Sequence, residues 1–198
     1  EVTLDAEAHR LIGVERVTYH NKSPHTLTYL WMQLDQNRFR KESIGSTSRA
    51  DGLDEEASIR WLRRVAFEQE FSGGFDITSI THKNNEPLYY IINDTMLRID
   101  LPEPLLPGGV FEYSLDWNHN IVNADVLRAR GGYEWFEGAE NAIYEMAQWF
   151  PRMFASTDYT GGQNKQFMRS GEFTLEFGNY TVAITVQDTF VVSAKGKP

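Results

Sequence analysis

Cysteine is absent from the 198 residues of the chain, and its absence excludes two kinds of protein. Neither a disulfide-stapled scaffold nor a thiolate metal site can form without it. We expect a periplasmic or extracellular location, although the same composition also fits a cytoplasmic protein.

Positive charge and long apolar runs are scarce as well. The chain has 19 Lys and Arg against 28 Asp and Glu, which gives a formal net charge of −9 at pH 7. Such a surface would repel a nucleic-acid backbone, and no basic run compensates for it. The longest apolar stretches, such as residues 89–92, fall far short of the roughly 18 residues that span a bilayer. We therefore expect neither a nucleic-acid partner nor a membrane span in this segment.

The pattern that is present repeats every two residues. Apolar and polar side chains alternate over residues 11–20, 27–32 and 75–80, which is typical of half-buried strands. Turn residues separate such runs every 8–12 positions or so, a rhythm found in β-sandwiches. A further strand is expected over residues 143–150, and others over three stretches near the end of the chain: residues 171–177, 180–186 and 189–193. The sequence thus predicts an all-β fold, a saddle-like sandwich of mostly antiparallel short strands in one domain, residues 1–198.

One segment departs from this rhythm. Apolar residues between Ile59 and Phe67 recur at helical spacing and precede a Gly-Gly pair. We expect one short helical insertion at about residues 54–70, with Asp51 or Asp54 capping its first turn.

Most catalytic motifs are missing. No two of the five histidines stand four residues apart, so the HExxH zinc pattern is absent, and no Gly-x-Ser-x-Gly elbow or phosphate-binding glycine loop occurs. Carboxylates cluster at Glu134, Glu137, Glu140 and Glu145, but their spacing in sequence does not fix the geometry that a glycosidase requires. We predict no metal site and no catalytic residue in this chain.

Aromatic residues make up 13% of the chain, enough to exclude a disordered segment. They are dense between residues 117 and 150, where one group includes Trp135, Phe136, Tyr144, Trp149 and Phe150. Such a group can form a domain core, an interface with another domain, or a platform that stacks against sugars. These alternatives stay open at this point.

Several separated blocks resemble one family. YEMAQWFPRM (residues 144–153) and GEFTLEFGNYTVAITV (residues 171–186) look like parts of the N-terminal domain of the aminopeptidase N family, zinc metallopeptidases of the gluzincin group, and most like its large bacterial members. The opening residues 2–39 and the ending FVVSAKG (residues 190–196) are similar to that domain too. The likeness covers nearly the whole chain except residues 41–71.

This resemblance implies a non-catalytic N-terminal β domain, truncated from a longer chain. In the family the domain packs on a thermolysin-like catalytic domain that carries HExxH, so the zinc ion and the peptide substrate would belong to that absent C-terminal part. The fragment alone is expected not to hydrolyse peptides. A homodimer through the surface left uncovered is a further expectation.

The resemblance also suggests substrate-binding residues. The family presents a Thr-Gln-x-Glu/Gln motif beside the zinc, and residues 147–150 align with it, so Gln148 matches the first Gln. Phe150 stands at the second polar position and cannot accept a hydrogen bond from a substrate ammonium group. Glu145 would take that role only if the backbone bulges. The competing interpretation is a free-standing β-sandwich module that binds carbohydrate through the Trp/Tyr cluster, or a protein partner.

Overall fold

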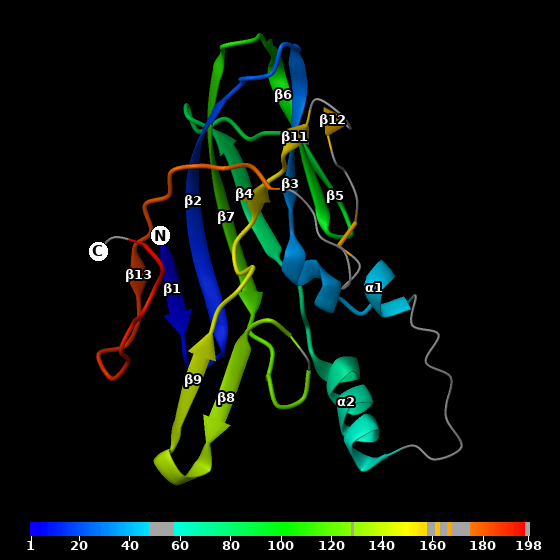
Figure 1. Ribbon diagram of the computed structural model, residues 1–198, viewed down its shortest axis with the longest axis vertical. Coiled ribbons are helices and arrows are strands. Elements are labelled where there is room, and N and C mark those ends of the chain that lie inside the picture. Colours follow the sequence, from blue (N-terminus) through cyan, green and yellow to red (C-terminus); the bar gives the residue numbers. More distant parts are fainter. Residues whose placement is uncertain (48–57, 128, 158–160, 163–165, 168–174, 197–198) are drawn as a thin grey trace.

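The computed structural model describes residues 1–47, 58–127, 129–157, 161–162, 166–167 and 175–196 (Figure 1). Two sheets form the body of the molecule, and their inward faces pack together around one hydrophobic core. The expected all-β sandwich is therefore confirmed. Among the described residues, no helix has both the length and the apolar character that a membrane crossing requires.

The larger sheet has the order β13-β1-β2-β7-β4. Its strands are β13 (Ile184–Thr185), β1 (Val2–Asp5), β2 (Arg10–His20), β7 (Val110–Asn120) and β4 (Asp76–His82). The smaller sheet has the order β10-β3-β6-β5 and consists of β10 (Arg152–Met153), β3 (Leu27–Gln33), β6 (Met96–Leu105) and β5 (Tyr90–Asn93). Strand pairs are antiparallel except for β1 with β13, which run parallel.

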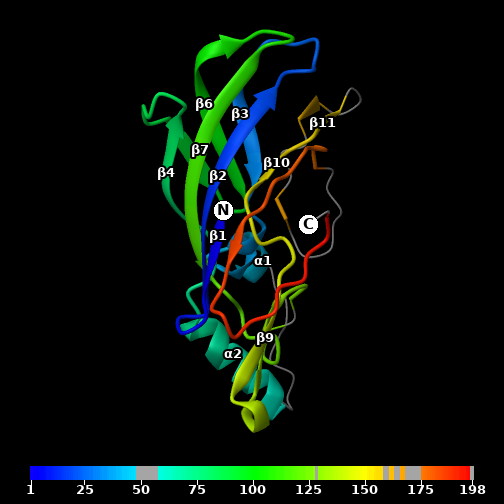
Figure 2. The same cartoon turned by 90° about the vertical axis from the view of Figure 1, so that its left-hand side faces the viewer.

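Strands β2 and β7 form the long centre of the larger sheet (Figure 2). Every second residue of β7 is buried, which matches the two-residue period of its sequence. Gly13 lies opposite Trp117, and a Cβ atom at position 13 would come within 2.2 Å of the indole ring. Glycine is thus the residue that lets this ring lie against the strand.

The expected helix is present, but it begins later than predicted. Helix α2 (Ile59–Glu70) has Ser58 as its N-cap, and the Ser58 hydroxyl accepts a hydrogen bond from the Trp61 backbone N–H at 3.2 Å. Asp51 and Asp54, the predicted caps, lie outside the described residues. Short helical turns also occur before this helix, at η1 (Asp35–Phe39) and α1 (Ile44–Thr47).

The end of the chain differs from the prediction. Of the three strands expected there, the described residues contain only the two-residue strand β13 and a single bridge from Leu175 to Phe154. Several apolar side chains of this segment are exposed, among them Phe177, Val182 and Val191. The alternating pattern is real, but among the described residues of this segment only β13 and Leu175 pair with a neighbouring strand or bridge, so most of its apolar side chains are left uncovered.

A separate hairpin extends below the two sheets (Figure 1). It consists of β8 (Gly132–Phe136), the turn η2 (Glu137–Ala139) and β9 (Asn141–Glu145), with regular pairing from Gly132–Glu145 to Phe136–Asn141. The prediction of a strand over residues 143–150 is therefore correct only as far as Glu145. The short hairpin of β11 (Ser156–Thr157) and β12 (Gly161–Gly162) completes the described strands.

Candidate functional site

The aromatic group predicted from the sequence divides into two parts in space. Trp135 and Phe136 end strand β8, and their side chains are 48% and 43% exposed. Tyr144 in β9 is half-buried, and its hydroxyl donates to the Ala6 carbonyl at 3.2 Å and lies 2.6 Å from His9 Nδ1. The hairpin is therefore anchored to the β1–β2 turn through Tyr144, while its tip presents two apolar rings to solvent.

The other part comprises Trp149 and Phe150, which follow β9. Their rings meet edge to face with centroids 4.7 Å apart. Trp149 lies 6.1 Å from the core ring of Trp117, and Phe150 lies 5.9 Å from Tyr180 in the segment after Leu175. These two aromatics thus connect the β7 core with the end of the chain instead of forming an open platform.

The two residues proposed for substrate binding sit in different local structures. Glu145 is exposed and closes strand β9, whereas Gln148 is half-buried in a bend with a left-handed φ of 56°. The Gln36 side-chain amide donates to the Gln148 carbonyl at 3.0 Å. A non-glycine residue with positive φ is uncommon and marks a turn held by its surroundings. Here the bend turns the chain from the hairpin back to the sandwich.

His119 fixes the same bend from the opposite side. Its Nδ1 lies 3.1 Å from the Asn120 carbonyl, and its Nε2 lies 3.1 Å from the Trp149 carbonyl. The ring is 3% exposed and packs against Phe75 and Trp117. Burial lowers the pKa of His119, so the neutral imidazole predominates at pH 7 and donates to one of the two carbonyls.

A buried ion pair supports the residue after this bend. Asp35 is 1% exposed in its side chain and accepts from Arg152 Nη2 at 2.5 Å and from Arg152 Nε at 3.1 Å. Burial raises the pKa of Asp35, and the Arg152 guanidinium opposes that rise. Because Arg152 begins β10, the pair holds the exit of the bend against the β3–η1 corner.

A hollow of about 850 Å³ lies on the inward side of β2, next to Trp149 and Phe150. The segment after Leu175 forms its other wall through residues that include Tyr180. Glu15 of β2 faces this hollow, and desolvation raises the pKa of its carboxyl to about 8. The inward face of β2 therefore carries one acid among apolar neighbours.

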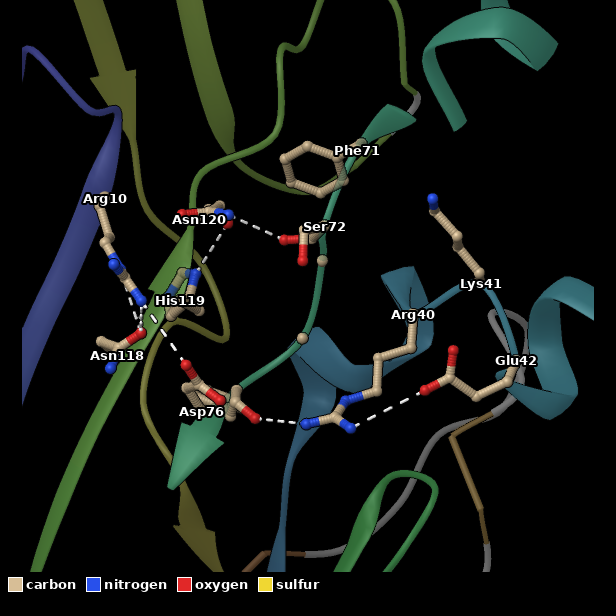
Figure 3. Close-up of a pocket in the computed structure, with 13 residues that line it drawn as sticks. Arg10, Arg40, Lys41, Glu42, Phe71, Ser72, Asp76, Asn118, His119 and Asn120 are labelled. Carbon is tan, nitrogen blue, oxygen red and sulfur yellow. Dashed lines mark hydrogen bonds and ion pairs between the residues drawn. The ribbon is translucent and has the colours of Figure 1, made fainter. Parts of the chain in front are cut away.

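A smaller recess of about 350 Å³ lies at the far end of β7, with His119 at its wall (Figure 3). Asp76 lies between the side chains of Arg10 and Arg40, 3.6 Å from Arg10 Nη2. Arg40 donates to the Phe75 carbonyl at 2.6 Å. Arg10 and Arg40 are thus matched by the protein's own acceptors.

The described residues hold no group of three or more His, Asp or Glu side chains that could bind a metal ion. Sequence reasoning missed Glu15 and His119 as notable residues. Glu15 could have been found, since it is an acid on the face of β2 that also carries Leu11, Val17 and Tyr19. His119 offered no comparable signal, because the Trp149 carbonyl and the Phe75 ring that surround it come from distant parts of the chain.

Comparison with known proteins finds partial structural similarity. No protein-family model matches the chain. No curated protein matches it either. Among solved structures, the chain is similar to an M1 zinc metallopeptidase from Deinococcus radiodurans, an E323A mutant bound to a Tyr-Ser-Ala substrate, at 13% identity and a TM-score of 0.36. The match covers 67% of this chain and 22% of that one, so the chain spans about a fifth of the length of its structural relative.

Proposed function

We propose that the chain is the N-terminal β domain of an aminopeptidase-N-like zinc metallopeptidase. In this proposal it packs on a thermolysin-like catalytic domain in the same longer protein and lines the substrate cleft of that domain. Zinc and the reacting groups belong to the catalytic domain, and the peptide substrate binds between the two. The fragment alone hydrolyses nothing.

The observation that carries the proposal is the meeting of the two sequence blocks that resemble the family. The first block runs through the bend at Gln148 into β10, and the second contains Leu175 and Glu176. The Glu176 backbone N–H donates to the Met153 carbonyl at 3.3 Å, and Phe154 bridges Leu175. The described ends of the two blocks, which lie about twenty residues apart in sequence, are thus side by side in space, as expected of parts of a shared surface.

The proposal gives the bend and the hairpin separate roles. Gln148 contributes a polar side chain to the cleft, and Glu145 lies at the edge of the same segment. The exposed rings of Trp135 and Phe136 provide apolar surface for the contact with the catalytic domain.

The test starts with the coding sequence that follows Pro198. We expect an HExxH motif within about a hundred codons, followed by a further Glu, as the gluzincin zinc site requires. The isolated chain should bind no stoichiometric zinc and should not cleave aminoacyl-amide substrates. A stop codon directly after Pro198, or zinc-dependent turnover by the isolated chain, would overturn the proposal.

A free-standing carbohydrate-binding module is the second candidate, and the exposed Trp135 favours it. Stacked sugars need an accessible aromatic face, which the hairpin tip supplies. Titration with oligosaccharides, followed by tryptophan fluorescence, distinguishes the two candidates. Saturable binding that Trp135→Ala abolishes would support the module, and no binding is expected for the peptidase domain.

A further inference from the structure

The hollow beside β2 contains a buried carboxyl next to a buried indole N–H. Glu15 Oε1 and Trp117 Nε1 form no hydrogen bond of normal geometry with the described residues. The indole N–H still lies close enough to Glu15 to offset part of the rise in the pKa of its carboxyl that burial causes. The β2–β7 register pairs Glu15 with Leu115 and Gly13 with Trp117, so the acid and the indole are diagonal neighbours on one sheet face. An unsatisfied buried polar group costs about 1–3 kcal/mol, so a ligand that pairs with the carboxyl recovers free energy.

The positive groups near Glu15 are already engaged by other acceptors. Arg152 is bound to Asp35, and Arg16 is bound to Glu1. The α-amino group of the first residue donates to the Val14 carbonyl at 2.9 Å. The other titratable groups that line the hollow are Glu176, Tyr19 and Tyr180, together with His20, Lys22 and His25 from the end of β2 and the turn that follows it. The α-amino group of Glu1 lowers the pKa of Glu15, but burial outweighs this effect and the pKa stays at about 8, so the Glu15 carboxyl is not compensated by a cation of the described residues.

Aromatic rings form one part of the wall of the hollow, beside polar residues such as Thr18, Ser23 and Asn179. Trp117 and Trp149 lie 6.1 Å apart, Phe150 packs on Trp149, and Tyr180 closes the side formed by the end of the chain. Aromatic faces attract organic cations, and the attraction strengthens when water is excluded. A volume of about 850 Å³ accommodates a small organic molecule.

We propose that this hollow binds an organic ammonium ion with an apolar body. The N–H groups of the ligand donate to the Glu15 carboxylate, and the apolar body lies against the rings of Trp149 and Phe150. The hollow and Glu15 carry this proposal whether or not the chain is a domain of a peptidase.

Binding of such a ligand is coupled to release of a proton. Because the pKa of Glu15 is about 8, the carboxyl is mostly protonated at pH 6 and must ionise to pair with a cation. The affinity should rise about tenfold for each pH unit up to pH 8 and level off above it. A ligand that accepts a hydrogen bond from the protonated carboxyl would show the opposite trend.

The experiment uses phenethylamine as the probe and 2-phenylethanol as its neutral counterpart. Tryptophan fluorescence and calorimetry follow binding to the chain from pH 6 to pH 9. We expect saturable binding of the amine, at least about tenfold tighter at pH 8.5 than at pH 6.5, with proton release seen in buffers of different ionisation enthalpy. The alcohol should bind at least about tenfold more weakly than the amine at pH 8.5.

Two variants identify the residue responsible. Glu15→Gln should weaken amine binding at least about tenfold at pH 8.5 and remove its pH dependence. Glu176→Gln removes another acid from the same hollow and should leave the affinity within about twofold.

Circular dichroism checks that both variants fold. If Glu15→Gln does not fold, the pH profile and the amine–alcohol comparison on the unaltered chain decide. Equal binding of amine and alcohol, unchanged binding by folded Glu15→Gln, or no saturation at pH 8.5 would overturn the proposal.

Discussion

Glu15 and His119 occupy neighbouring strands of the larger sheet, and burial favours the uncharged form of both. For an acid this raises the pKa, and for a histidine it lowers the pKa. Their effects on stability therefore have opposite signs as the pH rises. The two effects overlap between about pH 4.5 and pH 6.5, so each is isolated by substituting or titrating one of the two residues.

Glu15→Gln should change how stability depends on pH. The folded pKa of about 8 lies above the ordinary value of 4.5, so the folded state holds the proton more tightly. The free energy of unfolding of the unaltered chain then falls by on the order of 2–4 kcal/mol as the pH rises from about 4.5 to 8. The free energy of unfolding of the variant should not show this fall. Urea unfolding at pH 5 and pH 9 measures the difference. Glu134→Gln, an exposed acid in β8, serves as the control and should resemble the unaltered chain.

His119 should show the reverse dependence. Its folded pKa lies below 6.5, so the unfolded chain takes up a proton first as the pH falls, and stability declines below about pH 6.5. NMR titration of the His119 ring should give a midpoint below that of the same ring in the urea-unfolded chain. A folded midpoint equal to or above the unfolded one would show that contact with the two carbonyls outweighs burial.

Helix α2 depends on local contacts more than on packing. Ile59 and Leu62 are 70% and 52% exposed, while Phe67 stacks on Phe71 within the same segment at 5.3 Å. A helix with so little burial is stabilised mainly by its caps and by contacts along its own surface.

Ser58→Ala should therefore destabilise α2 by about 1 kcal/mol, because the Trp61 N–H loses its acceptor. Amide hydrogen exchange should accelerate in α2 and stay unchanged in β2 and β7. Ser58→Asp keeps an acceptor at the cap and adds charge that suits the helix N-terminus, so exchange should stay slow. Equal exchange in all three proteins would mean that the cap contributes nothing.

The strands show what the sequence can and cannot predict. The alternation in β2 and β7 predicts their half-buried character, because each strand has partners on both edges and one apolar face to bury. The alternation near Val182 is equally regular, yet only β13 pairs there. A two-residue period reports the preference of a segment for a sheet, while pairing also requires a free edge within reach.

The candidate site was predictable only where one segment defines it. The aromatic pair Trp149–Phe150 and the bend at Gln148 come from consecutive residues, so their proximity follows from the sequence. The hollow does not, because Glu15, Trp117 and Tyr180 are brought together by the β2–β7 register and by the path of the last segment. Contacts between distant segments depend on topology, which the local pattern leaves open.

Two exposed aromatic rings lie together at one place on the surface of the molecule. The two sheets bury their apolar faces against each other, whereas the β8–β9 hairpin leaves Trp135 and Phe136 uncovered at its tip. Adjacent exposed aromatics tend to be covered by a partner. In the proposed full protein that partner is the catalytic domain, and for the isolated chain we expect a second copy to take its place.

The isolated chain should therefore self-associate through the hairpin tip at high concentration. The double substitution Trp135→Ser and Phe136→Ser should shift sedimentation velocity profiles to the monomer, with the dissociation constant raised at least about tenfold, since each ring contributes about 1 kcal/mol or more when buried. Tyr89→Ser is the matched control, because Tyr89 is 66% exposed and lies beside β5, away from the hairpin. The Tyr89→Ser variant should associate like the unaltered chain.

In a longer protein that includes the proposed catalytic domain, association should disappear without any substitution. Association that persists in the double variant would assign the contact to another surface, and the exposed end of the chain around Phe177 would then be the next region to alter.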